Sequence, residues 1–180
     1  MLSCRIVSQP LDLETFAVSR GFTEHELKEL GVRIEGEEVV IPISGRAGVW
    51  YERRHRPGGS PKYLSPPGVE AHLINPLGLG PHSDVVWFAE GEFDTFSLVV
   101  SGIPAVGILG TQTFRKPWQY LFQGTEIIIA FDPDAAGEAA YEAMRGIFPD
   151  AQRFDCSPFE DLNDAFMADR SAFEKVVKAW

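Results

Sequence analysis

The chain has 180 residues, of which 44% are hydrophobic and 23% are charged, and its formal net charge is -10. This length and composition are typical of a folded globular protein and exclude an intrinsically disordered chain. No apolar run approaches the roughly 18 residues of a membrane span, and no secretory signal is evident at the start. We therefore expect a cytoplasmic protein with no membrane association.

The first part of the chain predicts a small α+β region. Two short amphipathic helices are expected between residues 11 and 31, and the second begins at Thr23 with Glu26 in capping-box position. Strands are expected over residues 38–43 and 49–54, with a turn between them. Proline and glycine are dense before residue 83, so we expect a boundary there that divides the chain into domains 1–82 and 83–180.

After residue 83, short apolar runs alternate with helical patterns, which is typical of a parallel sheet flanked by helices. The fold class predicted is therefore α/β. Strands are expected at 85–89, 105–109, 126–131 and 152–155, and helices at 92–101, 118–122, 135–145, 161–168 and 172–179.

Charge is unevenly distributed along the sequence. A basic strip between residues 46 and 62 contains one acid, Glu52, whereas acids gather after residues 89, 131 and 159. A basic strip beside an acidic cluster suits a polyanion held next to divalent cations. The alternative for the strip is a solvated hairpin. Its candidate nucleic-acid or nucleotide contacts are Arg46, Arg53, Arg54, Arg56, Lys62 and Tyr63.

Carboxylates directly follow two of the expected strands, and another opens the helix after the fourth expected strand. Ligands of open α/β sheets bind beyond the carboxyl ends of the strands, so these side chains are expected to converge on one rim. Gly91 and Gly137 are expected to relieve the tight backbone turns there. The set comprises Glu90, Asp94, Asp132, Asp134 and Asp161.

Several close carboxylates repel one another unless they bind divalent cations. Because no His or Cys supports them, oxygen ligands favour Mg²⁺ or Mn²⁺ over zinc. The alternative is that each acid only caps a helix or stabilises its dipole. The two cysteines, Cys4 and Cys156, lie far apart and indicate neither a zinc ribbon nor a disulfide framework.

These motifs resemble the Toprim domain of topoisomerases and DnaG-type primases. The matching segments are EGEFD at 90–94, FDPDAAG at 131–137 and DLND at 161–164. GILGT at 107–111 resembles the primase form in particular. Upstream, SRGFT at 19–23, IPI at 41–43 and PKYL at 61–64 resemble the basic N-terminal half of the primase core, so the likeness covers nearly the whole chain.

The resemblance implies a Rossmann-like Toprim sheet after a small basic α+β subdomain, and a polymerase that makes RNA primers on single-stranded DNA from ribonucleoside triphosphates. Glu90 would be the general acid or base and a metal ligand. Asp94, Asp132, Asp134 and Asp161 would hold the ions. Arg53 or Arg54, with Lys62 and Tyr63, would contact template or triphosphate.

The zinc-binding and helicase-docking modules of primases have no counterpart in this sequence. This suggests one half of a split phage-type primase that meets a zinc-binding subunit and a replicative helicase in trans, in a bacterial or phage-infected cell. Two other functions stay open. A Toprim nuclease would use a metal-activated water in place of a 3′ hydroxyl, and a non-catalytic accessory module would only dock on replication proteins.

Overall fold

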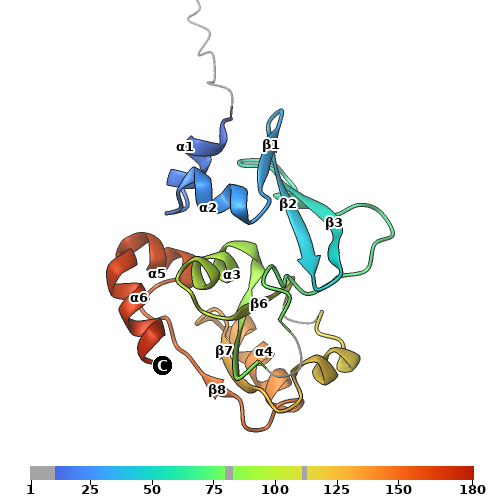
Figure 1. The fold of residues 1–180 in the computed structure, drawn as a ribbon, viewed down its shortest axis with the longest axis vertical. Coiled ribbons are helices and arrows are strands. Elements are labelled where there is room, and N and C mark those ends of the chain that lie inside the picture. Colours follow the sequence, from blue (N-terminus) through green and yellow to red (C-terminus); the bar gives the residue numbers. More distant parts are fainter. Residues whose placement is uncertain (1–10, 80–82, 111–112) are drawn as a thin grey trace, which may run out of the picture.

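The computed structural model describes residues 11–79, 83–110 and 113–180, which form two sheets of four strands each. The first sheet is antiparallel, and the second is parallel with strand order β6-β5-β7-β8. In Figure 1 the first sheet lies with α1 and α2 in the upper part of the molecule, and the parallel sheet with its helices lies below. The predicted α/β class is confirmed.

The N-terminal half follows the predicted order of elements. It contains α1 (Leu13–Val18), α2 (Glu24–Glu29), β1 (Arg33–Glu35), β2 (Glu38–Gly45), β3 (Gly48–His55) and β4 (Tyr63–Leu64). The capping box of α2 is present, because the Thr23 amide donates to Glu26 Oε2 at 2.8 Å and the Thr23 hydroxyl accepts from the Glu26 amide. The short edge strands β1 and β4 were not predicted.

The C-terminal half alternates strands and helices as expected. Its elements are β5 (Val85–Glu90), α3 (Gly91–Val100), β6 (Ala105–Ile108), η1 (Lys116–Phe122), β7 (Glu126–Ala130), α4 (Ala135–Arg145), β8 (Gln152–Arg153), α5 (Leu162–Ala168) and α6 (Arg170–Ala179). The helix expected at 118–122 is the 3₁₀ helix η1, which has proline in its first turn. The fourth strand has only two residues.

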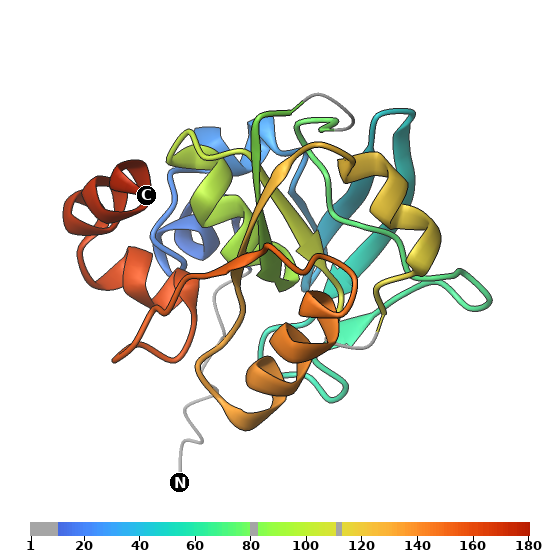
Figure 2. The ribbon, with the colours of Figure 1, turned by 90° about the horizontal axis from the view of Figure 1, so that it is seen from below.

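Alternation along β5 places the sheet between two hydrophobic layers. Val86 and Phe88 pack with η1 and α4, whereas Trp87 and Ala89 pack with α3, α5 and α6. Figure 2 shows α4 (orange) well apart from α5 and α6 (red). A helix layer on each face of a parallel sheet is what makes its strands apolar throughout.

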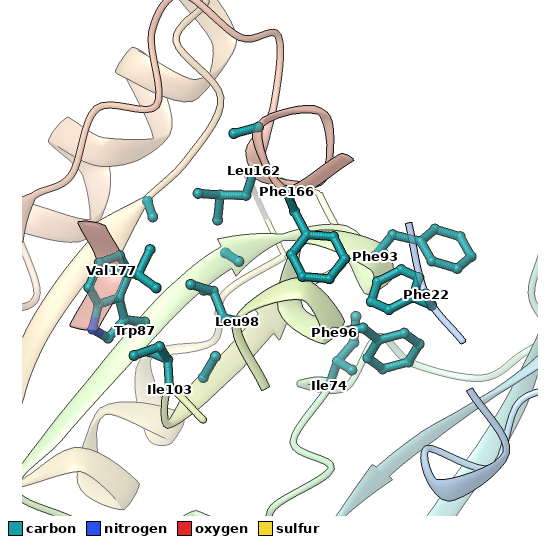
Figure 3. Packing of buried hydrophobic residues seen from close by; sticks show 14 of the residues in the cluster. Phe22, Ile74, Trp87, Phe93, Phe96, Leu98, Ile103, Leu162, Phe166 and Val177 are labelled. Atoms are coloured by element: carbon teal, nitrogen blue, oxygen red, sulfur yellow. The ribbon is translucent and has the colours of Figure 1, made fainter. Parts of the chain in front are cut away.

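One hydrophobic cluster joins the two halves of the chain. Phe22 packs against Phe93 of α3 and Phe166 of α5, with ring centroids 6.4 and 5.1 Å apart (Figure 3). The predicted division into 1–82 and 83–180 falls beside residues 80–82, outside the described residues, and stays a prediction. Cys4 and Thr111 also lie outside them. No helix among the described residues is long and apolar enough to cross a membrane.

Candidate active site

The first pair of acids lies where β5 gives way to α3. Glu90 is the last residue of the strand, and Gly91 turns the backbone at a φ of +75° that side chains rarely adopt. Asp94 follows in the first turn of α3, where its Oδ1 accepts a 2.9 Å hydrogen bond from the Asn163 amide. This bond ties the start of α3 to the start of α5.

The second pair follows β7 and depends on a close helix approach. A Cβ atom at Gly137 would collide with the carbonyl oxygen of Asp132, so only glycine lets α4 begin there. Asp134 is the N-cap of α4, and its Oδ1 accepts a 2.7 Å bond from the Gly137 amide. Both predicted glycine roles therefore have a steric basis.

The fifth acid, Asp161, is the N-cap of α5, and its Oδ1 accepts a 2.6 Å bond from the Asp164 amide. Asp134 and Asp161 therefore do cap helices, but each carboxylate keeps a second oxygen outside its cap bond, so whether they only cap is not decided by these bonds. The capping alternative does not describe Glu90, which makes no side-chain cap bond at the start of α3. Capping alone cannot explain why the set converges.

The negative charges of neighbouring acids contribute to raising the pKa values of Glu90, Asp94 and Asp132. Burial, followed by the negative charges of Glu90, Asp161 and Asp134, raises the pKa of Asp132 to about 7. Burial and the charge of Asp161 raise the pKa of Asp94 well above its usual range. Burial also raises the pKa of Glu90, whose Oε1 is buried without a hydrogen-bond partner among the described residues.

A hollow of about 320 Å³ is lined by four of the five acids together with groups from the N-terminal half. Asp134 does not line it, but its charge reaches Glu90 and Asp132. Among the lining side chains are Arg20, Arg53, Lys62, Tyr63, Glu90, Asp94, Asp132 and Asp161. The hollow is therefore acidic on the sheet side and basic on the opposite side.

The basic side is held in place by one residue in particular. Arg53 forms a 2.7 Å ion pair with Glu92, whose side chain is only 2% exposed, and its guanidinium lies 4.4 Å from the centroid of the Tyr63 ring. Lys62 Nζ lies 5.7 Å from the same centroid. Cations over aromatic faces are attracted by the ring quadrupole. Arg53, Lys62 and Tyr63 thus form one unit.

The other three predicted basic contacts lie outside this hollow. Arg54 pairs with Glu35 at 2.9 Å and Glu38 at 3.0 Å, because successive residues of β3 point to opposite faces. Arg56 donates to the Pro61 carbonyl, and Arg46 lies at the β2–β3 turn beside a different hollow. A role for these three in nucleic-acid binding stays a prediction.

Two functional candidates were missed at the level of sequence. Arg20 lines the hollow and stacks 4.7 Å from the Phe93 centroid; its only signal was its place in the SRGFT segment. Arg153 of β8 donates to the Asp132 carbonyl at 3.3 Å, and its positive charge lowers the pKa of both Glu90 and Asp132. Nothing in the sequence around residue 153 indicated that role.

The donor set fits a hard divalent cation. Among the described residues no three His, Cys, Asp or Glu side chains are already positioned to hold one ion. However, the negatively charged groups of the shared hollow are all carboxylates, and burial together with neighbouring negative charge raises the pKa values of Glu90, Asp94 and Asp132. One Glu90 oxygen has no hydrogen-bond partner among the described residues. Such a set is relieved by Mg²⁺ or Mn²⁺ rather than by zinc.

Comparison with known proteins identifies relatives of this chain. The family model described as Toprim-like matches residues 87–166. The Gene 57 protein of Mycobacterium phage D29 is 31% identical over 106 residues, which cover 58% of this chain and 70% of that protein. The chain belongs to the Toprim-like family. The family segment begins in β5 and ends in α5, and so includes all five acids.

Primases are among the relatives of this Toprim-like chain. The DNA primase of Clostridium acetobutylicum is 28% identical over 154 residues, which cover 74% of this chain. The chain spans about a quarter (26%) of that primase. The solved primase fragment of the bacteriophage T7 primase-helicase protein has a TM-score of 0.68 at 20% identity, over 90% of this chain and 72% of that fragment. The predicted resemblance to primase catalytic cores is confirmed at the level of fold and homology.

Proposed function

We propose that this chain is the catalytic core of a DNA primase, which uses Mg²⁺ or Mn²⁺ to join ribonucleotides on a single-stranded DNA template. The observation that carries the proposal is the hollow that acids from the ends of β5 and β7, from α3 and from the start of α5 line together with Arg53, Lys62 and Tyr63. An acidic wall opposite a basic wall suits a triphosphate, whose oxygens need positive charge on every side.

The residues have separate tasks in this proposal. Asp132, Asp134, Asp161 and Glu90 would hold the cations, with Asp94 beside them. When bound, the ions would neutralise the phosphate charge that grows as pyrophosphate leaves. Arg53 and Lys62 would bind phosphate oxygens, and Tyr63 would supply a ring surface for a base or sugar.

Glu90 would act as the general base that accepts the proton of the 3′ hydroxyl. The 3′ oxygen forms a bond to the α-phosphorus of the incoming nucleotide, and the bond from that phosphorus to the pyrophosphate oxygen breaks. The hydroxyl proton must leave as the oxygen attacks. Glu90 has an unpartnered Oε1 and a raised pKa, which suit a general base working near neutral pH.

A template-dependent assay tests the proposal. The full chain is supplied with single-stranded DNA, all four ribonucleotides and Mg²⁺ or Mn²⁺, and product length is followed. The combined change Asp132→Asn and Asp134→Asn should lower synthesis by roughly 10²-fold or more. Asp150→Asn removes one exposed acid outside the hollow and should not. Shortening of the oligonucleotide without nucleotide use would instead indicate the nuclease.

The predicted partners form a separate part of the proposal. Likeness to the primase part of a primase-helicase supports contact with a replicative helicase. Likeness to the Aquifex aeolicus primase, whose solved structure contains zinc-binding and RNA polymerase domains, supports a zinc-binding subunit. A pull-down from the native host with the full chain as bait would test both. Recovery of neither protein, under conditions in which the chain binds DNA, would contradict this part.

A further inference from the structure

Trp50 is an aromatic side chain that the folding of the chain does not bury. Its side chain is 51% exposed, although it lies within β3. The pairing of β2 with β3 runs from Ile43 with Tyr51 directly to Ser44 with Val49, so Trp50 is the extra residue of a β-bulge. Bulges re-aim side chains and recur next to functional sites.

The indole is held in a fixed orientation. The His72 ring stacks on it with centroids 4.7 Å apart and planes 7° from parallel. Its Nε1 packs so closely on Gly45 that a Cβ atom there would lie 2.8 Å away. The Asn75 amide donates to the Ser44 carbonyl at 2.9 Å, which fastens the His72 segment to the hairpin. Since half of Trp50 stays exposed, a rigid aromatic surface is left open.

A hollow of about 170 Å³ adjoins this surface. Trp118, Leu73 and Arg46 line it together with Trp50 and His72. The volume is well below the roughly 300 Å³ of a drug-sized pocket. It therefore suits one flat ring system and not a whole nucleotide triphosphate.

The positive charges near this hollow favour a negatively charged ligand. Arg46 and Lys116 are exposed and form no ion pair within the described part of the chain. Arg115 lies 5.6 Å from the Trp118 centroid, and its ion-pair partner is Glu70. Arg46 lines the hollow together with the exposed Trp50, so a cation without an ion-pair partner among the described residues lies near an exposed aromatic ring. Positive charge interleaved with stacking surfaces is how single-stranded nucleic acid is bound.

The geometry points to Trp50, backed by His72, as a stacking site for one base of a single-stranded nucleic acid, with Arg46 on the neighbouring phosphate. Trp50 and Arg53 are three residues apart on β3, so a strand that leaves the acidic hollow needs to cross only about 10 Å. This inference deepens the proposed function, on which it rests, by giving the template a second contact outside the active site.

The test measures binding without catalysis. Fluorescence anisotropy of a labelled single-stranded oligonucleotide is recorded with the full chain in the absence of divalent ions. Trp50→Ala should weaken binding by roughly 5- to 100-fold, as expected for loss of one stacked base, while Trp50→Phe should restore most of it. Tyr120→Ala removes another aromatic side chain that is 60% exposed and should leave binding unchanged.

Salt dependence separates stacking from charge. Trp50→Ala should leave the slope of log affinity against log salt unchanged, whereas Arg46→Ala should reduce it by about one phosphate contact. Equal losses for Trp50→Ala and Tyr120→Ala, or no binding by the parent chain, would overturn the inference. Displacement of the oligonucleotide by free mononucleotide at this site, lost in Trp50→Ala, would also overturn it.

Failure of the two proposals is distinguishable. If the parent chain polymerises no ribonucleotides but Trp50→Ala still weakens oligonucleotide binding, the primase proposal fails and the stacking site stands. If the chain polymerises and Trp50→Ala binds normally, only the stacking site fails.

Discussion

Glu92, in the first turn of α3, holds Arg53 of β3 through an ion pair of 2.7 Å that bridges 39 positions of sequence. The carboxylate is 2% exposed and the guanidinium 22% exposed, so the pair lies largely out of water. It fastens the basic wall of the hollow to the acidic wall. The width of the hollow therefore depends on an ion pair between the N-terminal and the C-terminal half of the chain.

Removing one partner of this ion pair should lower the free energy of unfolding more than its share of removing both partners together. Arg53→Met leaves a buried carboxylate without its partner and should lower the free energy of unfolding by about 2–4 kcal/mol. Arg53→Met combined with Glu92→Gln should cost less than the sum of the single changes. Urea unfolding of the four proteins gives the coupling energy. The matched control is Arg54→Met, whose partners Glu35 and Glu38 lie at the surface, and its cost should be below about 1 kcal/mol.

Asp132 should destabilise the protein when no divalent ion is bound. Its pKa is about 7 in the folded state against an ordinary 3.8, so the folded state binds more protons between these values and stability falls as pH rises through this range. Above that pKa, Asp132→Asn should raise the free energy of unfolding of the metal-free protein by about 1–2 kcal/mol. Thermal unfolding in a chelator would measure this.

With Mg²⁺ added, the parent chain should become more stable than Asp132→Asn. The parent chain should gain stability with ion concentration, because only the folded state binds the ion. Asp132→Asn should gain much less. If Asp132→Asn in the presence of chelator unfolds more easily than the parent chain, the ionised Asp132 carboxylate does not destabilise the metal-free fold as its burial and its acidic neighbours imply.

The capping role and the charge of Asp134 can be separated by two substitutions. Asn is as good an N-cap as Asp, so Asp134→Asn should keep the bond from the Gly137 amide and change stability little. Asp134→Ala should lose the cap and about 1 kcal/mol. Both should lower primer synthesis, since both remove the carboxylate. Unaltered synthesis by Asp134→Asn would make this acid a cap and nothing more.

The convergence of the acids could be predicted because it depends on a simple rule of parallel sheets. Glu90 and Asp132 follow apolar runs, and neighbouring parallel strands bring their carboxyl ends to one edge. The capping box of α2 was likewise local, since Thr23 and Glu26 satisfy each other within one turn. Signals of this kind need no knowledge of the tertiary fold.

The basic wall could be predicted only in part. Arg53 and Arg54 are adjacent arginines that the sequence alone does not distinguish. Only the register of β3 places Arg53 at the hollow and Arg54 beside β1. The bulge at Trp50 and the approach of Arg20 depend on contacts between distant segments. No periodicity in the sequence encodes either of them.

His55 should make the protein sensitive to mild acid. It is 1% exposed between the rings of Phe16, Tyr63 and Phe93, and the positive charges that face it belong to Arg20, Lys62 and Arg53. Burial and these cations lower its pKa from 6.5 to about 4. Its Nδ1 has no hydrogen-bond partner among the described residues that would favour the protonated form.

The direction in which stability changes with pH follows from proton binding at His55. Between these two pKa values the unfolded chain binds a proton at His55 that the folded chain does not, so stability is complete above about 6.5 and is lost as pH falls toward about 4. The loss should reach up to roughly 3 kcal/mol. Carboxylates titrate in the lower part of this range, so the parent chain must be compared with His55→Phe by chemical unfolding at a series of pH values. The difference between the two curves should grow as pH falls, and a constant difference would mean that folding does not change the pKa of His55.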